Sequence, residues 1–358
     1  MVMCLFVPMN VRAQEDIIER FDFTEIENVI EDIFPEEKMS FSDFISKIVT
    51  GETFMWNEVL EFIWKQITYE FQSARKSLIH ILLIAIIAAI FHNFSGVFQN
   101  QHVAELSFYI LYMLMMAICL NVFQLLMKSV EVGVSQLLDF FRALGPVYFM
   151  SVAITTGSGT SIVFYNIMLF VIYLVELLIT QILLPLVQMF FVIQMLNHMS
   201  KEEYLSKFGE LLQIIIKWSL RTLLAAIVGI NVVQGMLTPA IDSVKRRAML
   251  GSGEAIPFIG DVIGGTADVF LGTAVLIRNG IGIAGMIISF GICITPIVQM
   301  MVIVLAYRLA AAVMQPISEK RMIGCMETMG ESTSLLLQIV ITVCALFLIV
   351  IAIVANTA

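Results

Sequence analysis

Charged residues are scarce in this chain of 358 residues. Lysine, arginine, aspartate and glutamate make up 14% of it, whereas soluble globular domains carry about 25%. Apolar residues account for 59%, and the mean hydropathy is +0.93. So few charges exclude an ordinary soluble globular domain, and the composition indicates a protein that crosses the membrane several times.

Cysteine and histidine are also sparse, and neither is arranged for chemistry. The five cysteines form no CxxC pair, and three of them lie in apolar runs, where cysteine behaves as a small hydrophobe. His80 and His92 are about 18 Å apart along a helix, too far to share one metal ion. We therefore expect no disulfide framework, no metal site and no cofactor.

Catalytic motifs are missing as well. The chain contains no Walker A lysine motif, no GxSxG elbow and no HExxH. Gly280, Gly282 and Gly285 spell GxGxxG, but this pattern indicates dinucleotide binding only after a strand in a βαβ unit, and here it lies in an apolar run. We expect no enzymatic activity and no binding of nucleic acid.

The acidic residues are concentrated near the N-terminus. Residues 14–76 hold 15 acidic and 6 basic side chains, which leaves 14 of each for the rest of the chain, from totals of 29 and 20. Residues 1–13 resemble the end of a signal peptide without its basic start, with an apolar tail as the alternative. Residues 14–76 predict three short amphipathic helices outside the cytoplasm, the first opened by a capping box of Thr24 and Glu27. Residues 77–358 form the predicted membrane domain.

Apolar runs predict about seven membrane spans, with six to eight compatible with the sequence. The segments expected to cross or enter the membrane are 78–98, 103–127, 132–156, 162–196, 211–237, 256–277, 281–315 and 334–354. Two runs, 162–196 and 281–315, are too long for one straight span, and Pro185 and Pro296 lie inside them. We expect a helix break or kink at each proline, which leaves either tilted helices or the discontinuous helices of transporters. The predicted fold is an all-α, polytopic transmembrane helical bundle.

A few charged residues lie inside these apolar runs. A carboxylate within a membrane span is a functional candidate by default, so Glu176 is one, as are Asp261 and Asp268, seven residues apart. The alternative for Glu176 is a structural ion pair with an arginine such as Arg221 or Arg308. Asp139 and Arg142 are three apart and can pair on one helix.

Glycine is concentrated in one apolar stretch. Ten of the 21 glycines lie between Gly251 and Gly291, where small residues let membrane helices approach closely. Gly260 and Gly264 share one helix face, and the candidate helix-packing positions are these two with Gly280, Gly282 and Gly285.

The same stretch carries a family resemblance. The run PFIGDVIGGTADVFLGTAVLIRNGIGIAG at 257–285 and the run YRLAAAVMQPISEKRMIGCMETMG at 307–330 resemble the C-terminal half of the stage III sporulation protein AE family. NVVQG at 231–235, with Asp242 and Lys245, is similar to the middle of that family. The resemblance covers about Lys76 to the C-terminus and includes no catalytic motif.

This resemblance implies a role in bacterial endospore formation. The family acts in the mother-cell membrane around the engulfed forespore, in a secretion-like channel complex needed for late forespore gene expression. The implied partners are the other membrane proteins of its operon, a cytosolic ATPase, a forespore membrane protein and a YidC-type insertase. A secondary transporter for a small solute is the alternative that the residues leave open.

Basic residues suggest the orientation of the domain. Lys245, Arg246 and Arg247 lie in the segment 242–255, and Lys320 and Arg321 lie in the segment 316–332. The positive-inside rule places both segments in the cytoplasm, which requires two crossings or re-entrant pieces between them.

Overall fold

The computed structural model describes residues 22–34, 40–50, scattered positions from 64 to 86, and residues 101–156, 158–200, 204–250, 260–316 and 318–356. Side chains are not described for 231–250 and 260–274, among smaller groups. Every element of this part is a helix. The expected signal segment 1–13 and most of the expected span 78–98 lie outside the described residues.

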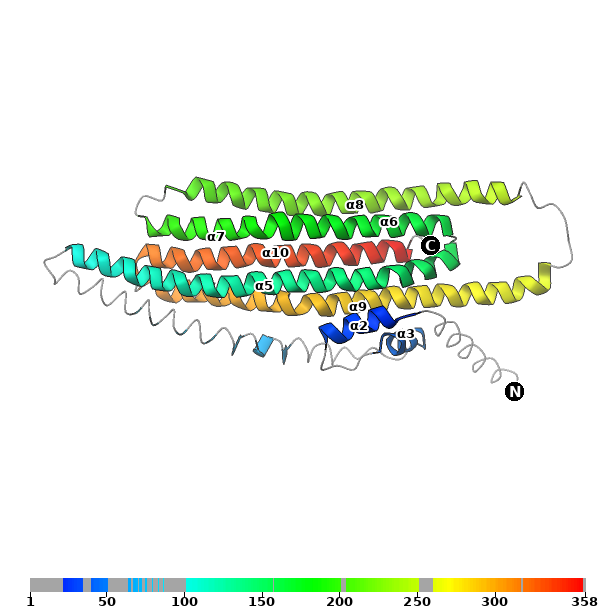
Figure 1. Ribbon diagram of the computed structural model, residues 1–358, viewed down its shortest axis with the longest axis horizontal. Coiled ribbons are helices and arrows are strands. Elements are labelled where there is room, and N and C mark those ends of the chain that lie inside the picture. Colours follow the sequence, from blue (N-terminus) through cyan, green and yellow to red (C-terminus); the bar gives the residue numbers. More distant parts are fainter. Residues whose placement is uncertain are drawn as a thin grey trace.

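Long antiparallel helices make up the bundle (Figure 1). They are α5 (Gln101–Thr156), α6 (Ser158–Val175), the π-helix η1 (Glu176–Leu183), α7 (Leu184–Met199), α8 (Ser206–Leu250), α9 (Gly260–Met314) and α10 (Lys320–Asn356). The elements α6, η1 and α7 follow one another as one helical run. At 56 residues, α5 is about 84 Å long, well over the roughly 30 Å of bilayer hydrocarbon.

Five helical segments of the described part are long and apolar enough to cross a membrane. They are Phe108–Ile154, Tyr165–Met199, Ser206–Ile230, Val275–Met314 and Lys320–Ala352. The all-α membrane bundle expected from the sequence is therefore confirmed. Two pairs of segments expected as separate pieces are each one helix. Residues 103–127 and 132–156 both belong to α5, and residues 260–277 and 281–314 both belong to α9.

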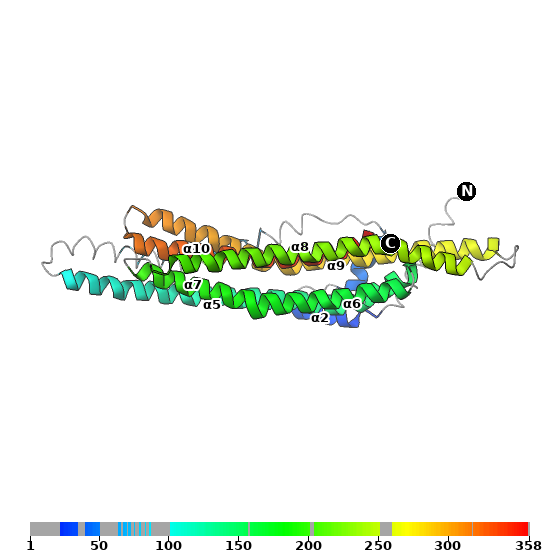
Figure 2. The same ribbon diagram turned by 90° about the horizontal axis from the view of Figure 1, so that it is seen from above.

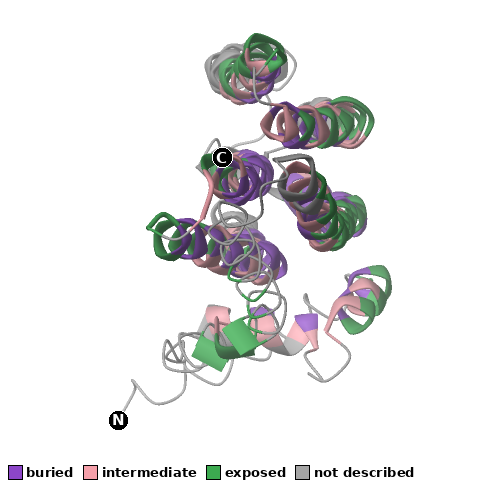
Figure 3. Ribbon diagram, turned by 90° about the vertical axis from the view of Figure 1, so that its left-hand side faces the viewer, coloured by how far each residue is buried: buried purple, intermediate pink, exposed green. Residues whose placement is uncertain are grey.

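Helix α10 lies in the middle of the bundle. It packs against α5, α7, α8 and α9, and its apolar segment is the most buried of the five. The end-on view in Figure 3 shows the other long helices grouped around it. Large rings fill the interfaces, with Phe123 stacked on Phe191 at 4.1 Å between centroids and Phe141 stacked on Phe347 at 4.2 Å.

The short helices α2 (Thr24–Ile33) and α3 (Phe41–Thr50) pack on the flank of the bundle. Helix α2 contacts α5 and α3 contacts α9. Figure 1 shows both short helices along one edge of the bundle, and Figure 2 shows α2 from above. Ile26, Ile30 and Ile45 are buried in the same core as the long helices. The N-terminal region thus shares its hydrophobic core with the membrane domain.

The capping box expected at Thr24 and Glu27 is not formed. Thr24 instead donates from its N–H and its hydroxyl to Asp22 Oδ1, at 3.1 and 2.6 Å, which lowers the pKa of the Asp22 carboxyl. Glu27 accepts a hydrogen bond of 2.9 Å from the Ser40 hydroxyl, next to the start of α3. Glu27, which the local spacing assigned to a helix cap, therefore makes a contact between α2 and the start of α3 instead.

Candidate functional site: an ion-pair network on the outer face

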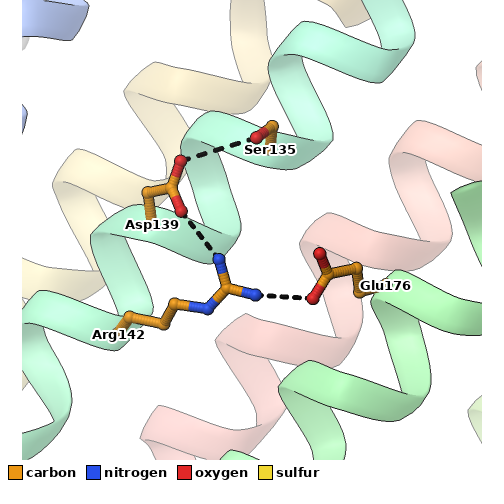
Figure 4. A network of polar contacts seen from close by, with 4 residues as sticks. All are labelled: Ser135, Asp139, Arg142 and Glu176. Carbon is orange, nitrogen blue, oxygen red and sulfur yellow. Dashed lines mark hydrogen bonds and ion pairs between the residues drawn. The ribbon is translucent and has the colours of Figure 1, made fainter.

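One arginine joins two carboxylates on the outer face of the bundle. Arg142 Nη1 lies 2.9 Å from Asp139 Oδ1 on the same helix, and Arg142 Nη2 lies 2.5 Å from Glu176 Oε2 at the start of η1. Ser135 Oγ donates to the other oxygen of Asp139 at 3.5 Å. Figure 4 shows these four side chains bridging α5 and the neighbouring helical run.

Glu176 has an arginine partner, but a different one from those expected. Its partner is Arg142, three residues from Asp139, and not Arg221 or Arg308, which the sequence had suggested. The pair of Asp139 and Arg142 expected on one helix is present. All three charged side chains are between 44% and 50% exposed, so Glu176 does not point into the interior of the bundle.

The π-helix η1 places Glu176 at the point where the helix widens. The N–H of Leu184 donates to the carbonyl of Ile179, five residues back, and Pro185 follows directly as the second residue of α7. In an α-helix the proline ring clashes with the carbonyl four residues before it, and a wider π turn relieves this clash. Pro185 therefore changes the winding of the helix without breaking it.

Pro296 does not break its helix either. Helix α9 continues through it, so the expected break is absent. The Pro296 ring lies against Gly133 of α5, where an added Cβ would be 3.2 Å from Pro296 Cγ. The ring fills the space that glycine leaves, and this packing offsets the hydrogen bond that proline cannot make in a helix.

The remaining candidate charges are spread along the bundle and do not form one site. Arg221 is exposed on α8, and Arg308 is exposed on α9 with its Cγ beside Gly330 of α10. Asp261 and Asp268 lie in the first turns of α9, where side chains are not described. Among the described residues, no group of three or more His, Cys, Asp or Glu side chains is placed to hold a metal ion.

Two of the candidate glycines lie at close helix contacts. A Cβ added at Gly285 would be 2.8 Å from Leu144 Cδ2 of α5, and one added at Gly282 would be 3.4 Å from the Tyr148 hydroxyl. Gly280 lies on the same helix and is buried. The side-chain surroundings of Gly260 and Gly264 are outside the described residues, so their packing role stays a prediction.

Sequence reasoning missed other close contacts made by isolated glycines. An added Cβ would meet Tyr165 at Gly145, Gln194 at Gly209 and His198 at Gly324, with distances of 3.2 Å at Gly145 and 2.6 Å at Gly324 to the nearest atoms. These glycines lie outside the glycine-rich stretch, so composition gave no signal for them. A glycine that faces a large side chain on another helix can be recognised only when it is known which helices pack together.

Two arginines with structural roles were also missed. Arg278 is only 3% exposed in α9, and its guanidinium donates to the Asn279 side chain at 3.3 Å. Arg321 lies 3.6 Å from the centroid of the Phe108 ring and donates to the Met199 carbonyl at 3.4 Å. A lone arginine between apolar residues is the signal that identifies Arg278, whereas Arg321 appeared only as a basic loop residue.

The long apolar helices, their shared core and the charges confined to a few positions define the class of this molecule as a multi-pass helical membrane protein. The chain belongs to the stage III sporulation protein AE family, whose model matches residues 39–358. The stage III sporulation protein AE of Bacillus subtilis (strain 168) is 25% identical over 302 residues, covering 84% of this chain and 75% of that protein. No solved structure matches the chain.

Proposed function

We propose that this protein is a non-enzymatic membrane component of a channel complex that connects the mother cell with the forespore during endospore formation. Membership of the stage III sporulation protein AE family supports the link to sporulation. The complex would lie in the mother-cell membrane that surrounds the forespore and would support late forespore gene expression.

The position of Glu176 favours this proposal over the alternative of a secondary transporter. A coupling carboxylate of a secondary transporter lies near the bilayer midplane at an interior substrate site. Glu176 instead pairs with Arg142 on the outer face, with its side chain 46% exposed. Such a site suits contact with another molecule better than it suits the binding of a small solute inside the bundle.

A component without an energy source of its own needs partners. The partners proposed are the other stage III sporulation membrane proteins of the same operon, their cytosolic ATPase, a membrane protein of the forespore, and a YidC-type insertase that assists assembly in the lipid bilayer. The tight glycine contacts of the described helices agree with a protein that acts as a rigid scaffold.

The test is purification of an affinity-tagged chain from sporulating cells in mild detergent, with mass spectrometry of the proteins that come with it. A tagged membrane protein of unrelated function from the same cells is the control. We expect the ATPase and the operon's membrane proteins to be enriched only with this chain. Recovery of the chain without them, together with normal spore counts after its deletion, would refute the proposal.

A further inference from the structure

A polar face runs along the outside of α5, within its apolar sequence. Seven exposed or half-exposed polar side chains follow one another at intervals of three or four residues, which places them on one side of the helix. This polar face consists of Asn121, Gln124, Lys128, Glu131, Ser135, Asp139 and Arg142. Glu176 joins it from η1 through the ion pair with Arg142.

The polar face lies at the middle of the apolar segment Phe108–Ile154. From Asn121 to Arg142 it extends about 32 Å, close to the thickness of the hydrocarbon layer. The segment is longer than one crossing, but every stretch of about 20 residues within it, the length of one crossing, contains at least two members of the polar face. Some of these side chains therefore lie within the bilayer wherever the bilayer crosses α5.

Exposed apolar side chains surround this face. Leu114, Leu125 and Val132 are 50%, 63% and 44% exposed on α5, and Tyr173 on α6 is 60% exposed. Such residues suit contact with lipid. Amide and charged groups in hydrocarbon are costly, because lipid offers no hydrogen-bond partners. Ser135, Asp139 and Arg142 bond to one another and to Glu176. The other four members, Asn121, Gln124, Lys128 and Glu131, therefore require a covering surface that supplies such partners.

The side chains of the polar face can pair with the same face of a second copy of the chain. Asn121 and Gln124 carry both donors and acceptors, so each can bond to the same residue of a second copy. The charges come in neighbouring pairs of opposite sign, Lys128 with Glu131 and Asp139 with Arg142. Under a two-fold axis normal to the membrane, each charge lies within about one helical turn of an opposite charge on the other copy.

The spacing of the polar residues along α5 also supports a second copy of the chain as the partner. Positions 121, 124, 128, 131 and 135 alternate steps of three and four residues, which is the spacing of the contact seam between two helices that cross at a shallow angle. We propose that two copies of this chain associate in the membrane through the polar face of α5, with the two α5 helices parallel about a two-fold axis.

Cysteine cross-linking in membranes tests this association on the full-length chain with its native cysteines replaced. Asn121→Cys and Ser135→Cys should each form a disulfide-linked dimer of twice the chain mass on mild oxidation. Met301→Cys on α9, a position that is 53% exposed in an apolar segment, is the matched control and should stay monomeric. Cross-linking to a different protein, cross-linking within one chain, or no difference from the control would overturn the proposal.

An exchange of the charges at positions 128 and 131 distinguishes a variant that has lost the contact between copies from one that has failed to fold. Lys128→Glu alone should lower the dimer fraction at least fivefold in cross-linking at position 121, because positions 128 and 131 of both copies then carry only negative charges and no opposite charge lies one turn away. The exchanged double variant, Lys128→Glu with Glu131→Lys, should restore it, since opposite neighbours return. Failure of the double variant to recover while the chain accumulates normally would contradict a pairing of two identical faces.

Discussion

Arg142 neutralises two carboxylates that belong to different helices. Its guanidinium contacts Asp139 on α5 and Glu176 on η1 at the same time. On a water-exposed surface such pairs contribute at most about 1 kcal/mol. In an apolar segment the cost of an unpaired charge is larger, about 3 kcal/mol at the bilayer centre on insertion scales. The three residues are therefore expected to depend on one another.

Removal of the arginine should be more harmful than removal of one carboxylate. Arg142→Leu leaves the carboxylates of Asp139 on α5 and Glu176 on η1 without their arginine partner, so we expect strongly reduced accumulation in membranes. Glu176→Gln keeps the Asp139 partner of Arg142, so its loss should be smaller. Quantitative immunoblots of both variants, beside the neutral triple variant Asp139→Asn, Arg142→Gln, Glu176→Gln, test this order. Equal accumulation of all variants would show that the network does not stabilise the protein.

Gly324 should tolerate no side chain. A Cβ there would lie 2.6 Å from His198 Nδ1 and 2.8 Å from two ring carbons, so the His198 ring or the two helices α10 and α7 would have to shift. Gly324→Ala should cost about 1–3 kcal/mol through overpacking, measured as a lower Tm in detergent. Gly229→Ala is the matched control, because nothing lies within 4 Å of an added Cβ there. It should match the wild type or exceed it, since alanine favours helix over glycine.

At the scale of single elements, Pro185 explains the winding of the helix that carries Glu176. Pro185→Ala restores the missing N–H and removes the ring, so the preceding turns should return to α-helical winding. Residues before the proline would then rotate relative to α5. Cysteines at 142 and 176 should be joined by a bifunctional thiol reagent that spans the length of the Arg142–Glu176 pair with Pro185 present, and much less with alanine there. Unchanged cross-linking would mean that the proline does not set the π-helix.

Hydrophobic runs and composition were enough to predict an all-α membrane bundle, because lipid permits few other solutions. They did not predict how the runs join. Pro296 looked like a break from local rules, yet Gly133, 163 residues earlier, provides the space that accommodates its ring. The partner of Glu176 was missed for the same reason, since nothing in the local sequence says that Arg142 faces η1.

At the scale of the whole molecule, the continuity of α9 changes the expected orientation. The prediction that both basic segments, 242–255 and 316–332, lie in the cytoplasm required two crossings or re-entrant pieces between them. In the described residues one helix, Gly260–Met314, joins the two ends of the bundle instead (Figure 1). Lys245, Arg246 and Arg247 now favour a cytoplasmic position for the α8–α9 end, with the α9–α10 end on the other side.

Long uninterrupted helices carry this chain from one side of the membrane to the other. Single cysteines at Arg246 and Gln315, in a background without the native cysteines, test this by labelling of intact, non-sporulating cells that express the chain, with a membrane-impermeant thiol reagent. We expect Gln315→Cys to react in intact cells and Arg246→Cys to react only after permeabilisation. Labelling of both positions from the same side would contradict the account.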